Sequence, residues 1–70
     1  MADIKSQISG TVWQVLVEVG QEVTEEEDLI ILESMKMEIP VSATQDGTIS
    51  EILVQPGQAI QEGQVLLKLA

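Results

Sequence analysis

The chain repeats part of its own sequence: residues 10–17 read GTVWQVLV, and residues 47–54, 37 positions later, read GTISEILV. Further pairs superimposed by this shift are Gly20 and Gly57, Val23 and Ile60, and Leu32 and Leu69. Neither half is long enough to bury its apolar residues alone, so the two halves are expected to pack around one shared core. The sequence therefore predicts a single domain, residues 1–70, in which both halves follow the same path.

The apolar residues are mainly Val, Ile and Leu, and they fall in short blocks separated by Gly, Pro, Gln or acidic residues. This pattern is typical of all-β barrels and sandwiches, and no stretch keeps a helical period between capping residues. Strands are predicted at residues 4–7, 12–18, 22–23, 28–33, 37–42, 48–54, 59–60 and 64–69. We expect a flattened eight-stranded barrel-sandwich of two four-stranded antiparallel sheets related by a pseudo-twofold axis.

This symmetry makes the turn between the halves equivalent to the pair of chain termini. Lys36 is therefore expected at one end of the molecule, and Met1 and Ala70 at the other. Pro40 is expected at a sheet edge, because proline cannot donate a ladder hydrogen bond. Glu26 stands where the second half has Gly63. A positive φ there would cost Glu26 about 1 kcal/mol, which favours a rearranged turn in the first half.

The composition excludes several kinds of site. The chain has no cysteine and no histidine, which removes disulfides, thiolate nucleophiles, imidazole bases and the usual zinc ligands. Three basic residues against twelve acidic ones give a net charge of −9, which repels nucleic acid and anionic membranes. No apolar run has transmembrane length, and residues 1–5 lack the apolar core of a signal peptide. We expect a monomer of the cytoplasm or an organelle matrix.

Lys36 lies between Met35 and Met37 in the turn that joins the halves. A lysine in a turn is ordinary. Two exposed methionines beside it stabilise the fold little, and they indicate a surface that another protein recognises. Neither Met35 nor Lys36 is Gly or Asn, so a four-residue connection around a type I turn is expected rather than a primed two-residue turn. An exposed lysine amine is the usual target of enzymatic acylation.

The remaining charged and aromatic residues have less specific contexts. Lys5 and Lys68 lack methionine neighbours and are interpreted as edge or surface lysines. Glu33 and Glu38 flank the central turn; either they keep the strand ends solvated or they present charge to a modifying enzyme. Trp13, the one aromatic residue, is expected to have a half-buried packing role.

Met35, Lys36 and Met37 resemble the biotinyl-lysine site of biotin carboxyl carrier domains, whose usual pattern is Ala-Met-Lys-Met, with Ser34 at the alanine position. The flanking repeats also resemble the two halves of the biotinyl/lipoyl domain, so the resemblance covers nearly the whole chain. It implies covalent biotin on Lys36, attached by a biotin protein ligase. The other residues it assigns to this site are Met35 and Met37 for ligase recognition, and Ser34, Glu33 and Glu38 as the flanking hairpin.

The resemblance implies a non-catalytic carrier. It would shuttle carboxybiotin on a swinging arm between the biotin carboxylase and carboxyltransferase components of a biotin-dependent carboxylase or decarboxylase. The chain departs from the family pattern at Ile8-Ser9, where a Pro-Met-Pro lead is common, and at Glu26, which replaces a common glycine. Residues 17–23 are too few for the protruding thumb of the bacterial acetyl-CoA carboxylase carrier, so the chain resembles thumbless domains or a free-standing attachment protein.

Two alternatives follow from other proteins of this shape. A lipoyl domain has the same fold and an acylated hairpin lysine, but usually presents Asp before that lysine and Ala or Thr after it, where this chain has Met35 and Met37. Lipoate is therefore the second cofactor considered, alone or together with biotin. The barrel-sandwich of periplasmic efflux adaptors is a pure interaction module, but it is accompanied by a secretion signal and long helical hairpins, which this sequence lacks.

Overall fold

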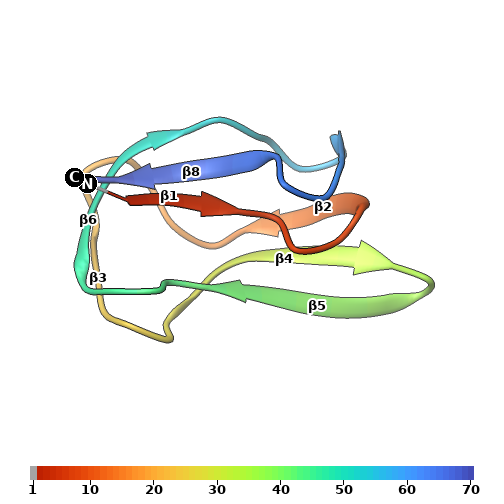
Figure 1. Ribbon diagram of the computed structural model, residues 1–70, viewed down its shortest axis with the longest axis horizontal. Coiled ribbons are helices and arrows are strands. Elements are labelled where there is room, and N and C mark those ends of the chain that lie inside the picture. Colours follow the sequence, from red (N-terminus) through yellow and green to blue (C-terminus); the bar gives the residue numbers. More distant parts are fainter. Residues whose placement is uncertain (1) are drawn as a thin grey trace.

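The computed structural model describes residues 2–70, and in this range it contains eight β-strands and no helix (Figure 1). The strands are β1 (Ala2–Lys5), β2 (Gly10–Val15), β3 (Glu22–Val23), β4 (Asp28–Ser34), β5 (Met37–Ser42), β6 (Gly47–Ile52), β7 (Ala59–Ile60) and β8 (Val65–Leu69). The N-terminal strand was predicted two residues too late. The chain turns after Lys5, because the Ser6 hydroxyl donates to the Ile8 carbonyl and holds the backbone in a bend.

The strands form two four-stranded antiparallel sheets, with the orders β1-β8-β6-β3 and β5-β4-β2-β7. The 37-residue shift carries the strands of one sheet onto those of the other in the same order. The predicted flattened barrel-sandwich with pseudo-twofold symmetry is confirmed. Pro40 lies in β5, an edge strand, as its missing amide hydrogen requires.

Matching hydrogen bonds tie each half of the chain to the other. The Gly20 amide donates to the Ile49 carbonyl, and the equivalent Gly57 amide donates to the Val12 carbonyl, both at 2.7 Å. Each half thus supplies the donor for the carbonyl of a buried residue in the other half. The two halves are intertwined, and separating them would leave these groups unpaired.

One apolar core lies between the two sheets. Its buried residues are Ile4, Val12, Val17, Val23, Leu29, Ile30, Leu32, Ala43, Ile49, Val54, Ile60, Leu66, Leu67 and Leu69. Fully burying one such side chain stabilises a protein by roughly 1.5 to 3 kcal/mol. Since both halves contribute to the same cluster, the core stabilises the whole chain as one unit.

Glu26 keeps the geometry of Gly63, so the predicted rearrangement of the first turn is wrong. The φ angle is 72° at Glu26 and 86° at Gly63. The Glu26 amide donates to the Ala43 carbonyl and the Gly63 amide to the Ser6 carbonyl, each at 2.8 Å. A net backbone hydrogen bond is worth about 1 kcal/mol, similar to the strain of a left-handed glutamate, and losing it would also leave a carbonyl unpaired.

We expect Glu26→Gly to stabilise the protein, because glycine adopts this φ without strain. The gain should be about 0.5 to 1 kcal/mol after allowing for the greater freedom of glycine in the unfolded chain. Thermal unfolding should show a Tm rise of roughly 4 °C for a domain of this size. Glu25→Gly is the matched control, since it removes the same charge at a position without positive φ. A rise in both variants would assign the effect to charge instead.

The molecule is elongated, with extents of 30 × 18 × 18 Å. Figure 1 shows the turn between β4 and β5 at one end of the long axis and the C-terminus at the other. Lys36 and Ala70 are therefore at opposite ends, as the symmetry predicts; Met1, placed with Ala70 in that prediction, lies outside the described residues. Nothing in residues 2–70 forms a helix able to span a membrane.

Candidate functional site

The hairpin of β4 and β5 carries the sequence motif at its tip. Its strands pair from Asp28 opposite Ser42 to Ser34 opposite Met37, which leaves only Met35 and Lys36 as the loop. Both have positive φ, 54° and 64°. The predicted four-residue type I connection is therefore wrong: the loop is a two-residue turn of the primed kind, whose twist matches that of the paired strands.

Strand pairing overrides the local preference of Met35 and Lys36. A left-handed conformation costs a non-glycine residue about 1 kcal/mol. It persists because Leu32, almost fully buried, fixes β4 in the core, and the in-register pairing of β4 with β5 brings the two strand ends together. Strained backbone of this kind gathers at functional sites. The lysine consequently sits on a defined turn rather than a long mobile loop.

The structure gathers the predicted site residues at this tip. Met35 is 88% exposed and Met37 59% exposed, on either side of the exposed Lys36. The others are Ser34, which is partly covered, and Glu33 and Glu38, which are exposed and face each other in register across β4 and β5. Two large apolar side chains thus border a free amine in solvent, although neither contributes to the core.

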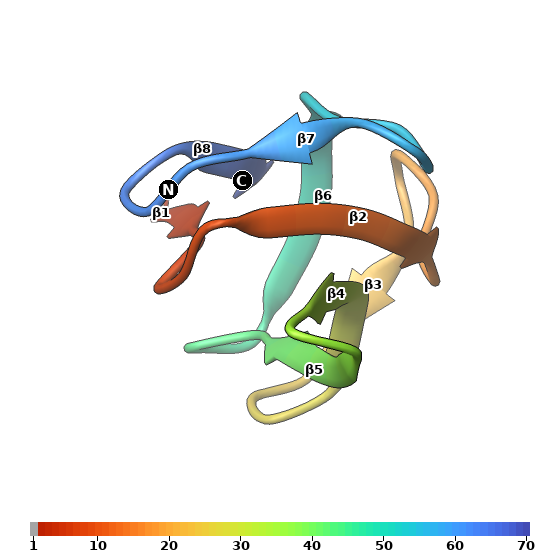
Figure 2. The ribbon, with the colours of Figure 1, turned by 90° about the vertical axis from the view of Figure 1, so that its right-hand side faces the viewer.

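Gly10 supports the base of the hairpin, a role that the sequence analysis missed. Strand β2 runs beside β4, and Figure 2 looks at the hairpin end of these strands. A Cβ atom on Gly10 would lie 2.6 Å from the Glu33 carbonyl oxygen and 3.3 Å from the Ser34 Cβ. Only glycine allows β2 to pass this close to β4. The sequence did show that glycine recurs at positions 10 and 47, but it could not show that only Gly10 has a neighbouring strand too close for a Cβ atom.

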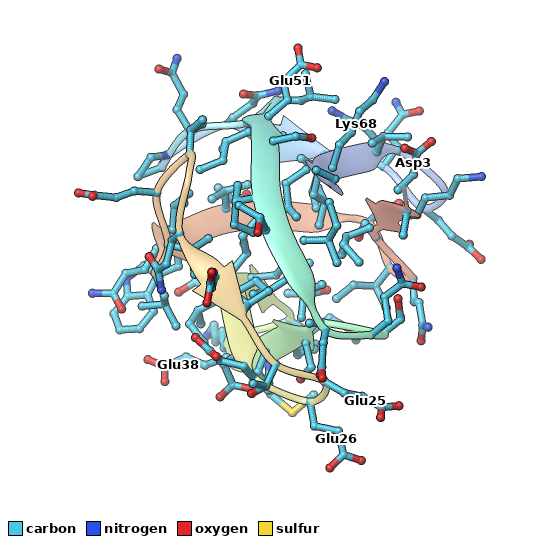
Figure 3. All side chains as sticks on the ribbon, turned by 90° about the vertical axis from the view of Figure 1, so that its left-hand side faces the viewer. Asp3, Glu25, Glu26, Glu38, Glu51 and Lys68 are labelled. Carbon is cyan, nitrogen blue, oxygen red and sulfur yellow. The ribbon has the colours of Figure 1, made fainter. Side chains whose placement is uncertain are left out.

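The other two lysines lie on the opposite sheet. Lys68 pairs in register with Asp3 on β1 and Glu51 on β6, and Figure 3 shows these three side chains on one side of the molecule. Lys5 is exposed in the edge strand β1. Neither is bordered by methionine.

Trp13 is 46% exposed and lies where the register between β2 and β4 shifts. It belongs neither to the buried core nor to the partly covered residues that pack on it. About half of its surface is covered, as predicted, and it lies outside the buried core. Trp13 is exposed because it lies at the register shift between Val12 and Gln14. The sequence pattern did not reveal this shift.

Two other features are separate from the hairpin tip. A groove of about 500 Å³ runs between the edge strands β1 and β5, lined by apolar residues that include Ile4, Ile39 and Val41. Lys36 is not among its lining residues. Among residues 2–70 no group of acidic side chains is arranged to hold a metal ion.

The family model described as "Biotin-requiring enzyme", Biotin_lipoyl, matches residues 1–69. The chain belongs to the biotin/lipoyl attachment family. It is 39% identical over 67 residues to the biotin/lipoyl attachment protein of Bacillus subtilis, covering 96% of this chain and 92% of that protein. It is also 46% identical over 61 residues to the biotin carboxyl carrier protein of Streptococcus mutans, covering 87% of this chain and 47% of that protein.

Among solved structures, the urea carboxylase of Kluyveromyces lactis contains a segment with the same fold. It superimposes with a TM-score of 0.93 at 29% identity, over 99% of this chain and 6% of that chain. This chain is thus similar to a protein of nearly its own length and to a short segment of a much longer carboxylase chain. The thumbless form expected from residues 17–23 agrees with the structure, in which only residues 16–21 separate β2 from β3.

Proposed function

We propose that the chain is a biotin carboxyl carrier module, non-catalytic by itself, which is biotinylated on Lys36. The observation that carries this proposal is the free amine of Lys36 at a two-residue turn, bordered by Met35 and Met37, which are 88% and 59% exposed. The names of two relatives, a biotin/lipoyl attachment protein and a biotin carboxyl carrier protein, support it.

The residues of the tip fit covalent attachment of biotin. The Lys36 Nζ, once deprotonated, can attack the carboxyl carbon of an activated biotin held by a biotin protein ligase; an amide bond forms and the activating group leaves. Nothing in the strands has to move, because the amine already stands in solvent. Met35 and Met37 offer flexible apolar contacts to the ligase, and Glu33 and Glu38 offer charge below them.

The domain would then contribute to the reaction by positioning the attached biotin. Biotin, when bound, supplies a ring nitrogen that accepts and gives up a carboxyl group. The β4–β5 hairpin holds the attachment point at one end of the 30 Å axis, away from the bulk of the domain. Tethering the cofactor in this way raises its effective concentration at biotin carboxylase and carboxyltransferase active sites. Those two components are the partners we propose.

Lipoate is the second candidate cofactor, supported by the name of the Bacillus subtilis relative. The same exposed amine would accept it. The two methionines favour biotin, because a lipoyl site usually has Asp before the lysine and Ala or Thr after it.

The test is the intact mass of the protein after co-expression with a biotin ligase and a lipoate ligase, followed by peptide mapping. We expect one biotin on Lys36 and no lipoate. The double variant Met35→Asp with Met37→Ala should lose most of its biotin and gain lipoate, because it presents the lipoyl pattern on an unchanged turn. Lipoate on the unmodified sequence would move the protein to acyl-transfer complexes, and no modification would contradict the carrier function.

A further inference from the structure

The internal symmetry allows the outer faces of the two sheets to be compared position by position. On one sheet, Asp3, Lys68 and Glu51 lie in register across β1, β8 and β6. The equivalent row on the other sheet, 37 positions away in sequence, is Pro40, Ile31 and Gln14 across β5, β4 and β2. A charged row on one face is thus replaced on the other by a row without charge.

The same replacement occurs at the irregularity beside this row. Ser50 lies at the register shift between β6 and β8, and its hydroxyl donates to the Lys68 carbonyl at 3.1 Å. Trp13 occupies the equivalent position in β2 and is 46% exposed. The Ser50 side shows that the fold does not need an aromatic residue here. An indole that is 46% exposed, next to the uncharged row of Pro40, Ile31 and Gln14, offers a large apolar contact to another protein.

This surface is continuous with the hairpin. The next row toward the tip contains Glu33 and Glu38, which face each other in register, with Thr11 on the other side of Glu33. We call Trp13, Ile31, Pro40, Glu33 and Glu38 together the Trp13 face. Figure 3 shows Glu38 on the opposite side of the molecule from Lys68, Asp3 and Glu51. The Trp13 face is therefore a second, acidic and apolar side of the domain that ends at Lys36.

The charges decide between possible occupants of the Trp13 face. A second copy of this chain would bring Glu33 and Glu38 against the same residues of the first, in a protein of net charge −9. Such like-charge contacts are unfavourable. A partner with an apolar pocket for the indole and lysine or arginine beside it is complementary. The Trp13 face also lies beside the tip, so a partner bound there leaves Lys36 and its arm free to reach an active site.

We propose that the Trp13 face is the docking surface for the biotin carboxylase component, which binds it through an apolar pocket rimmed by basic residues. This inference rests on the proposed function. Trp13 supplies the central apolar contact, and Glu33 and Glu38 orient the domain so that the arm on Lys36 points into the active site. The biotin protein ligase, by contrast, encloses the tip, where it meets Met35, Lys36 and Met37 with Glu33 and Glu38 beside them, and it does not need Trp13 or Ile31.

Two substitutions test the proposal, and the opposite sheet supplies both replacement residues. Trp13→Ser introduces the residue found at position 50, and Ile31→Lys the residue found at position 68, so the fold already accommodates each at an equivalent place. Lys68→Ala on the other face is the matched control. Each protein is fully biotinylated and offered as substrate to the biotin carboxylase component of the source organism, purified without its own carrier, with ATP and bicarbonate.

We expect Trp13→Ser and Ile31→Lys each to raise the KM for the biotinylated protein at least about tenfold, the usual loss at a central aromatic contact. The kcat, the Tm and the rate of biotinylation should stay unchanged, and Lys68→Ala should match the unmodified sequence. The KM should also rise with ionic strength, since charge complementarity is screened by salt.

An unchanged KM in both variants would overturn the proposal. An equal loss in the biotinylation rate would overturn it as well, by assigning the Trp13 face to the ligase or to folding. Failure of the proposed function is seen separately and earlier: the unsubstituted protein would then carry no biotin in its mass spectrum, before any variant is compared.

Discussion

Lys36→Arg is expected to carry no biotin at all while folding as the unsubstituted chain does. Arginine keeps the positive charge and meets the same φ of 64°, so neither the turn nor the strand pairing is altered. The guanidinium remains protonated at every usable pH and cannot act as the acylated nucleophile. Intact mass after co-expression with a biotin ligase gives the modification, and circular dichroism with thermal unfolding gives the fold.

Because the chain has few lysines, every side-chain amine can be tested by substitution. The chain contains three basic residues, all lysines, so Lys5→Arg and Lys68→Arg exhaust the other side-chain amines and serve as controls. Both variants should still accept one biotin, because they keep Lys36. Lys5 and Lys68 themselves lie in strands of the other sheet without methionine neighbours. Biotin found on the Lys36→Arg protein would refute the assignment of the site.

Gly10→Ala is expected to cause the largest loss of stability among the substitutions considered. The new Cβ would meet the Glu33 carbonyl oxygen at 2.6 Å, a backbone atom that cannot turn aside as a flexible side chain can. Either β2 or β4 has to shift, and overpacking of this kind costs about 2 kcal/mol. For a domain of this size, the Tm should fall by roughly 10 °C. Because Glu33 and Ser34 lead into the turn, biotinylation should slow as well.

Gly47→Ala is the matched control, since it changes the symmetry-related glycine. Its Cβ would lie 3.4 Å from the Leu69 Cβ, an ordinary contact, so we expect less than about 1 kcal/mol of destabilisation. Chemical denaturation of the two variants gives the comparison directly. Equal losses would show that the close approach at Gly10 is relieved without cost.

The positions of most strands could be read from the repeat. Strands β3, β5 and β7 have the predicted boundaries, and the pairing of halves followed from glycines that recur at the same spacing. The ends of several other strands were less well predicted. Strand β1 begins earlier and β2 ends earlier than expected, since a boundary depends on the partner available at each position and not only on the apolar pattern.

The two turns that have positive φ at residues other than glycine were wrongly predicted. Local preference disfavours a left-handed Glu26, Met35 or Lys36, and the prediction followed that preference. In the structure, the Glu26 amide bonds to Ala43 in the other half, and Met35 and Lys36 are all that remains between paired strands. Contacts made far along the chain therefore overrode the residues at the turn. Sequence alone could not weigh those contacts against the local strain.

What the sequence determined by itself was the repeat, and with it the number of strands, the shared core and the place of Lys36 at the end opposite Ala70. The spacing of apolar residues and the glycine positions suffice for this. Strands that alternate apolar and polar residues can pair in few registers if all the apolar side chains are to be buried. The tertiary structure alone decided the form of the turn that presents Lys36, the close passage of Gly10 against Glu33, and the exposure of Trp13 beside Ile31. These features depend on register and on distances between residues remote in sequence, which no local pattern records.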